Sequence, residues 1–339
     1  MKNRATFLRT ATAIVPLGFG CSNLLGNKTR DEGVRLLSAA YEAGIRHFDV
    51  ARYYGYGDAE GVVGEFLRTV PRNTVTITTK FGLQPLQVAG RLTGVVSAVR
   101  RLMRSSTMAR RLVSRNAHRL VRHGRFDVAS AASSLEISLR ELSTDYVDVL
   151  LMHEPTAVDC TPELFEFLSA AQTRGQIRLF GTGAAAAQTA EIVKRAPAFS
   201  EVVQFDRNIF ASRSESIVGE AAARDQKPTS ADSVIITHGS LAAIDPMRQR
   251  IARDVQFRTA VNELLQCDAS VPGNIAAALL AAAVQSNPFG IVLFRSAVTG
   301  RITENVRAVS DRFTTGQLKR LANLCHAKYQ RPDPENVDR

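Results

Sequence analysis

Cysteine is scarce in this sequence, and long uncharged apolar stretches are absent. The four cysteines lie far apart and form no Cys-x-x-Cys pair, which argues against a zinc knuckle or a disulfide framework. No run reaches the about 18 uncharged apolar residues that a membrane-spanning helix needs. From these two absences we expect a cytoplasmic protein.

The amino terminus admits a second interpretation, as a lipoprotein signal. The first residues are basic, and an apolar stretch ends just before Cys21. Arg9 interrupts this stretch, and Gly18 stands where such signals usually have leucine. We therefore interpret residues 14–20 as a buried strand. No Gly-x-Gly-x-x-Gly motif follows this or any other predicted strand, so the usual dinucleotide fingerprint is missing.

Acidic residues are absent between Gln84 and Phe126, a stretch that is rich in arginine. The net charge of +11 comes mostly from this segment, because the remainder of the chain is close to neutral. Apolar residues recur in it at helical spacing, which predicts an Arg-rich helical insertion at about 84–125. Four roles of this insertion remain open: a solvated helical segment, a lid over the pocket, a clamp for acidic substrates, or a contact with a membrane or another protein. The insertion has no aromatic residue to stack on bases, so we expect no nucleic-acid binding.

Short β-branched runs alternate with amphipathic segments along the chain, which is typical of a parallel α/β fold. Eight strands, each followed by a helical stretch, favour closure into a (β/α)₈ TIM barrel over an open sheet. We expect one barrel over residues 1–329 and a polar tail at 330–339. The predicted strands are 14–20, 47–51, 75–80, 146–152, 177–182, 202–205, 234–238 and 291–295.

The first predicted helix begins with a capping box, in which Glu32 follows Thr29 by three residues, and it ends near Gly44. The other predicted helices cover 59–67, 128–142, 162–174, 185–195, 214–223, 274–285, 302–310 and 315–327.

Ionisable side chains stand at the ends of three successive predicted strands. Asp49, Lys80 and His153 hold these positions, and Tyr54 follows Asp49 in the next loop. Functional side chains of a (β/α)₈ barrel gather at the carboxyl rim of the strands. A lone lysine or histidine there is usually a solvated cap, but three such strand ends beside a tyrosine indicate a site.

Carbonyl reduction suits these four side chains. Hydride attack builds negative charge on the carbonyl oxygen, which then needs a proton donor. Tyr54 would donate the proton, and the ammonium of Lys80 would lower the tyrosine's pKa. Asp49 would keep Lys80 charged and oriented, while His153 would hydrogen-bond the carbonyl oxygen. The chemistry needs no metal, and we expect none.

The chain resembles the aldo-keto reductase family. Residues 48–60, Phe-Asp-Val-Ala-Arg-Tyr-Tyr-Gly-Tyr-Gly-Asp-Ala-Glu, are similar to the Asp-x-Ala-x-x-Tyr-Gly…Glu block of that family. The resemblance identifies Asp49, Tyr54, Lys80 and His153 as the catalytic tetrad. It continues in order through residues 79–82, 134–142, 145–153, 175–181 and 202–205.

The resemblance also implies NADP(H) as the cofactor. Residues 295–305 are similar to the family's adenosine-phosphate site. A guanidinium fork and a helix amino terminus both suit a phosphate. Near the nicotinamide the resemblance places Asp49, Gln204 and His238. At the adenosine end it implies Arg295, Ser296, Arg301, Glu304 and Asn305.

Three departures from the family pattern concern the pocket. Gly183 and Ala184 stand where Ser-Asn usually grips the nicotinamide carboxamide, and His238 replaces a stacking tyrosine. Tryptophan, which is frequent in the family's substrate pockets, is absent. We expect an NADPH-dependent oxidoreductase that acts on a small-molecule aldehyde, ketone or sugar-like alcohol. The alternative is a cofactor-binding regulatory or interaction protein on a reductase-like barrel.

Overall fold

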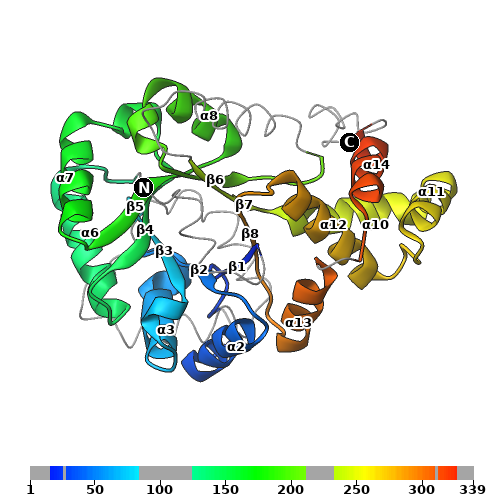
Figure 1. The fold of residues 1–339 in the computed structure, drawn as a ribbon, viewed down its shortest axis with the longest axis horizontal. Coiled ribbons are helices and arrows are strands. Elements are labelled where there is room, and N and C mark those ends of the chain that lie inside the picture. Colours follow the sequence, from blue (N-terminus) through cyan, green and yellow to red (C-terminus); the bar gives the residue numbers. More distant parts are fainter. Residues whose placement is uncertain (1–15, 26–27, 84–123, 211–232, 310–311, 327–339) are drawn as a thin grey trace, which may run out of the picture.

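Eight parallel strands form a closed barrel in which each strand pairs with its neighbours in chain order and β8 pairs with β1 (Figure 1). The computed structural model describes residues 16–25, 28–83, 124–210, 233–309 and 312–326. All eight predicted strands are present, so the predicted (β/α)₈ fold is confirmed. The strands are β1 Leu17–Gly20, β2 His47–Asp49, β3 Thr76–Phe81, β4 Val147–His153, β5 Ile177–Gly183, β6 Val202–Asp206, β7 Val234–His238 and β8 Ile291–Phe294.

Helices cover the outside of the barrel, and most of them begin and end close to the predicted positions (Figure 1). The capping box of the first helix is confirmed, since Thr29 N donates to Glu32 Oε2 at 2.7 Å and Glu32 N donates to Thr29 Oγ1 at 3.3 Å. The predicted helices found are α2 Arg30–Glu42, α3 Ala59–Leu67, α6 Val128–Glu141, α7 Pro162–Thr173, α8 Ala186–Arg195, α12 Pro272–Ser286, α13 Thr299–Ala308 and α14 Thr315–His326.

Within the described residues, two α-helices were not predicted, namely α10 (Ile244–Arg253) and α11 (Val255–Leu265). Asp254 ends the first and caps the second, whose Phe257 N donates to its carboxylate at 2.9 Å. Both helices pack with α12 and α14 around a separate apolar cluster beside the barrel. The predicted helix 214–223 and the insertion helices lie outside the described residues.

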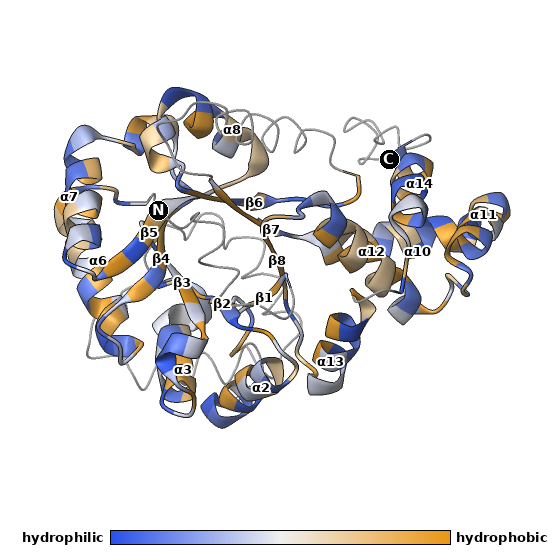
Figure 2. Ribbon diagram, in the orientation of Figure 1, coloured by the Kyte–Doolittle hydropathy of each residue, from blue (hydrophilic) through white to orange (hydrophobic). Residues whose placement is uncertain are grey.

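Two apolar layers hold the barrel together. Inside it, branched aliphatic side chains fill the centre, as is usual for this fold. Outside it, the strands pack against the apolar faces of the helices. Figure 2 shows β7 and β8 in hydrophobic colours, whereas the surrounding helices mix hydrophilic and hydrophobic residues. The inner layer consists of Val149, Leu151, Leu179, Val202, Val234, Ile236, Ile291 and Leu293.

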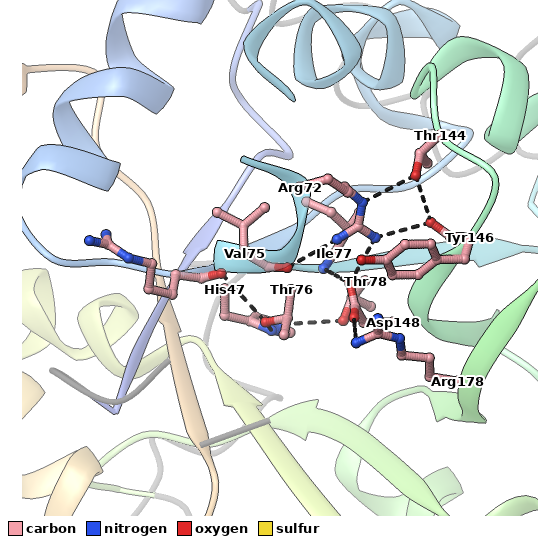
Figure 3. Close-up of polar contacts among 11 residues, drawn as sticks. His47, Arg72, Val75, Thr76, Ile77, Thr78, Thr144, Tyr146, Asp148 and Arg178 are labelled. Carbon is pink, nitrogen blue, oxygen red and sulfur yellow. Dashed lines mark hydrogen bonds and ion pairs between the residues drawn. The ribbon is translucent and has the colours of Figure 1, made fainter. Parts of the chain in front are cut away.

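A buried ion cluster ties β3, β4 and β5 together near their amino ends (Figure 3). Asp148 is fully buried and accepts hydrogen bonds at 2.9 Å from both Arg72 Nη2 and Ile77 N. Arg178 Nη1 lies 3.1 Å from its other oxygen. The two guanidinium groups lie 4.0 and 4.2 Å from the centre of the Tyr146 ring. The buried carboxylate therefore has charged partners on both oxygens.

Candidate active site

The four side chains predicted to form the site meet at the carboxyl rim of the barrel. Asp49 ends β2, Lys80 is the next-to-last residue of β3 and His153 ends β4. Tyr54 begins the short 3-10 helix η1 (Tyr54–Gly57), which lies in the loop that follows β2. Parallel strands bring their carboxyl ends to one edge, and this is why residues distant in the chain converge here.

Lys80 is at the centre of the polar contacts. Its Nζ donates to Asp49 Oδ1 at 2.5 Å and to Tyr54 Oη at 3.3 Å. The second oxygen of Asp49 accepts a hydrogen bond from Gln204 Nε2 at 2.8 Å. Lys80 and Asp49 are only 2% and 3% exposed, so the ammonium and the carboxylate depend on each other for compensation of their charge.

The loop that carries Tyr54 is fastened to β3 by Glu60. This carboxylate is fully buried; it accepts from Arg52 Nη1 at 2.9 Å and from Thr79 Oγ1 at 2.6 Å. Tyr54 N donates to Ala51 O at 3.0 Å. Because Thr79 precedes Lys80, Glu60 holds the tyrosine loop and the lysine strand in fixed relation. Glu60 was not predicted as a site residue, although it holds the glutamate position of the family block at residues 48–60, which was an available signal.

The direction of the Tyr54 pKa differs from the one predicted. Burial raises the pKa of Tyr54 and Asp49 adds to this effect, whereas Lys80 lowers it through its charge and its hydrogen bond. Lys80 thus acts in the predicted direction, but burial outweighs it and the net shift of the Tyr54 pKa is upward. Burial also disfavours the charged form of Lys80, but Asp49 and Tyr54 outweigh burial and raise the pKa of Lys80 above its ordinary value.

His153 faces Tyr54 across the rim, with the two ring centres 5.8 Å apart and the planes nearly perpendicular. Burial lowers the pKa of His153 to about 3, and the nearby ammonium of Lys80 acts in the same direction. The imidazole is therefore neutral at ordinary pH. Its Nδ1 is buried and has no hydrogen-bond partner among the described residues.

A cavity of about 470 Å³ opens above the tetrad. Gly183, Gln204, His238 and Arg295 also line it. A Cβ added at Gly183 would lie 3.0 Å from Gln204 Oε1, so the glycine leaves space beside that amide. A second cavity of about 210 Å³ shares Gly20 and Arg295 with the first and extends to Ser296. Together they form an elongated depression from the tetrad to the end of β8.

The predicted adenosine-site residues are not all brought to this depression. Arg295 is exposed and donates to Ser22 Oγ at 3.4 Å, and Ser296 lines the second cavity. Arg301, Glu304 and Asn305 lie on α13 and line neither cavity. Their contact with a cofactor stays a prediction.

Several cavity residues were not predicted. Glu154 follows His153 directly, and the segment Ser240, Leu241 and Ala242 forms part of another wall. Nothing in the local sequence pattern separates these residues from ordinary loop residues. Among the described residues, no cluster of three or more histidine, cysteine or acidic side chains could hold a metal ion, and no helix is long and apolar enough to cross a membrane.

Known proteins resemble this chain over most of its length. The model of the "Aldo/keto reductase family" matches residues 16–325. A D-threo-aldose 1-dehydrogenase from a Pseudomonas species is 27% identical over 335 residues, covering 91% of this chain and 94% of the relative. A pyridoxal 4-dehydrogenase from Microbacterium luteolum is 40% identical over 87 residues, which are 24% of this chain and 25% of that protein.

Solved structures share the same fold. A glycerol dehydrogenase from Gluconobacter oxydans superposes with a TM-score of 0.66 at 20% identity, covering 94% of each chain. An aldo-keto reductase from Bacillus halodurans gives a TM-score of 0.66 at 19% identity and covers 92% of each chain. Because the family model spans nearly the whole barrel, including every strand that carries the site, the chain belongs to the aldo/keto reductase family of oxidoreductases.

Proposed function

We propose that this protein is an NADP(H)-dependent oxidoreductase that interconverts a small carbonyl compound and its alcohol, with Tyr54 as the general acid. The observation that carries the proposal is the buried Asp49–Lys80 pair whose ammonium also contacts the Tyr54 hydroxyl, on the floor of a cavity. This arrangement provides a proton donor and a means to stabilise the anion left behind.

The elongated depression supports a dinucleotide. Asp49, Gln204 and His238 would hold the nicotinamide end, and Arg295 and Ser296 would hold the phosphate-bearing end. When bound, the cofactor supplies the hydride. The lack of a side chain at Gly183 leaves Gln204 Oε1 uncrowded on the side of the cavity where the nicotinamide would lie. Arg295, which lines both cavities, favours a cofactor that carries an additional phosphate, and we propose NADP(H) for this reason. A contact from Arg301 stays a prediction.

Lys80 makes proton transfer from a buried tyrosine possible. Burial alone opposes the phenolate form of Tyr54, as the raised pKa of Tyr54 shows. The ammonium at 3.3 Å stabilises the phenolate once the proton has moved to the substrate oxygen. Asp49 keeps Lys80 protonated and holds its ammonium next to the Tyr54 oxygen. In the direction of alcohol oxidation, the same phenolate accepts the proton.

His153 would orient the carbonyl as a neutral hydrogen-bond donor. An unpaired acceptor nitrogen costs less than an unpaired buried N–H. Because Nδ1 has no partner among the described residues, the tautomer with the proton on Nε2 is favoured. Nε2–H can then donate to the substrate oxygen that receives the Tyr54 proton.

The relatives suggest the kind of substrate. A threo-aldose dehydrogenase and a glycerol dehydrogenase both act, by their names, on hydroxylated small molecules. We propose the same broad class for this chain. The cytoplasmic location, the single-barrel organisation and a membrane or protein contact through residues 84–125 stay predictions.

The test compares the wild-type protein with Tyr54→Phe. We expect the wild type to consume NADPH with a panel of aldehydes, and the variant to lose at least about a hundredfold in kcat, within the range for general acid catalysis. NADPH binding, measured by the fluorescence of the reduced cofactor, should be unchanged. Wild-type protein that binds NADPH without turning over any aldehyde would contradict the proposal and favour a cofactor-binding regulatory protein.

A further inference from the structure

Glu154 has an unusual backbone conformation at the edge of the catalytic cavity. It follows His153 directly, and its φ of 58° lies in the left-handed region, which is rare for a residue other than glycine. Its N–H donates to Gly183 O at 2.8 Å, which extends the pairing of β4 with β5 by one residue. Such backbone strain, of the order of 1 kcal/mol or more, tends to occur at functional sites.

Glu154 lines the same cavity as Tyr54, Lys80 and His153. Its Oε2 accepts a hydrogen bond from Ala185 N at 3.4 Å, and among the described residues this is the side chain's one hydrogen bond. A carboxylate offers about four acceptor positions. Most of the acceptor capacity of Glu154 is therefore left for other groups in the cavity.

A purely structural role as a cap of α8 explains little of this arrangement. The first N–H of that helix, from Ala186, donates to Asp206 Oδ1 at 2.9 Å, which is a better hydrogen bond than the one that Glu154 accepts. Asp206 thus caps α8 without Glu154. Partial burial raises the pKa of Glu154, and the negative charge of Asp206 contributes in the same direction. A cap alone would need neither the strained backbone nor a place in the cavity wall.

We propose that Glu154 determines the substrate class, by accepting hydrogen bonds from hydroxyl groups of a neutral polyhydroxylated carbonyl compound and by repelling substrates with an anionic group. This inference rests on the proposed function, because it concerns the same cavity. Glu154 lines the cavity beside His153, and this position would bring its carboxylate within reach of the carbon chain of a substrate held at the tetrad. A hydroxyl donor gains a charge-assisted hydrogen bond there, whereas a carboxylate or phosphate meets a like charge.

The experiment measures kcat/KM with NADPH for three aldehydes: glyceraldehyde, benzaldehyde and succinic semialdehyde. They are respectively hydroxylated, apolar and anionic. The variants are Glu154→Leu, which removes the acceptor, and Glu154→Gln, which removes the charge but keeps an acceptor. Glu136→Gln, at an exposed position of α6, is the matched control.

With Glu154→Leu we expect kcat/KM for glyceraldehyde to fall about tenfold or more, mainly through a higher KM. A change of this size corresponds to the loss of one hydrogen bond to a charged group. The kcat/KM for benzaldehyde should change by less than about threefold. With Glu154→Gln, we expect succinic semialdehyde to improve relative to benzaldehyde, while glyceraldehyde retains most of its rate. The control should leave all three substrates unchanged.

The ratios between substrates separate a specificity role from a structural one. An equal loss for all three aldehydes with Glu154→Leu would assign Glu154 to support of the fold and overturn the inference. An unchanged glyceraldehyde-to-benzaldehyde ratio would overturn it as well, while the proposed function would stand if the wild type reduces benzaldehyde. A wild type that reduces none of the three would refute the proposed function and this inference with it.

Discussion

Replacement of Asp49 by asparagine would test how the buried ammonium is maintained. Lys80 Nζ has Asp49 at 2.5 Å, Tyr54 Oη at 3.3 Å and Val50 O at 3.4 Å, and Asp49 is the one anion among these partners. At 2.5 Å and an effective dielectric of about 20, the attraction of the two charges is about 7 kcal/mol. Removal of one partner of a buried pair costs about 3–5 kcal/mol. We expect this loss for Asp49→Asn at pH 7.

The loss should shrink as the pH rises. In the wild type, Asp49 and Tyr54 keep the pKa of Lys80 above its ordinary value. Without the carboxylate, burial dominates and the pKa of Lys80 falls below the value of the unfolded chain, about 10.4. The unfolded variant then binds more protons than the folded one, so its stability increases with pH up to that value. Urea unfolding at pH 7 and pH 9.5, with the wild type as reference, measures the difference.

The control is the double variant Asp49→Asn, Lys80→Met, in which no charge is left without a partner. It should be more stable than Asp49→Asn at pH 7, and the difference between it and the wild type should vary little between the two pH values. A destabilisation of Asp49→Asn that is the same at both pH values would refute the reasoning. So would a double variant less stable than the single one.

Three further predictions concern stability. Burial lowers the pKa of His47 to about 4, so the stability that neutral His47 contributes is fully present above about pH 6.5 and is lost as the pH falls toward 4. At about 1.4 kcal/mol per pKa unit, this contribution is about 3 kcal/mol. When the free energy of unfolding is measured as a function of acid pH, His47→Gln should therefore lose less stability than the wild type. Asp148→Asn leaves Arg72 without its partner and should cost about 3–5 kcal/mol in urea unfolding, whereas a loss below about 1 kcal/mol would mean that the cluster contributes little. A Cβ at Gly181 would lie 1.8 Å from Val202 O, so Gly181→Ala should lower stability by about 3 kcal/mol or more, and a melting temperature equal to that of the wild type would contradict the tight packing of β5 on β6.

The sequence by itself determined the barrel and predicted which four side chains meet at its rim. Eight short apolar runs could be recognised because strands of a parallel sheet are buried on both faces. Asp49, Lys80 and His153 stood out because each ends such a run with a side chain that a buried strand avoids. Because parallel strands of a barrel present their carboxyl ends at one rim, the strand pattern predicts that these three side chains lie together.

Only the tertiary structure decided the energetics of the site. Burial depends on residues from many strands at once, so the upward shift of the Tyr54 pKa and the neutral state of His153 could not be read from neighbouring residues. The contact of Glu60 with Thr79 and the placement of Glu154 in the cavity wall depend on pairing between separate elements. A local sequence pattern predicts where a strand lies and which residue type ends it. The distance between two side chains on different strands is set only when the barrel closes.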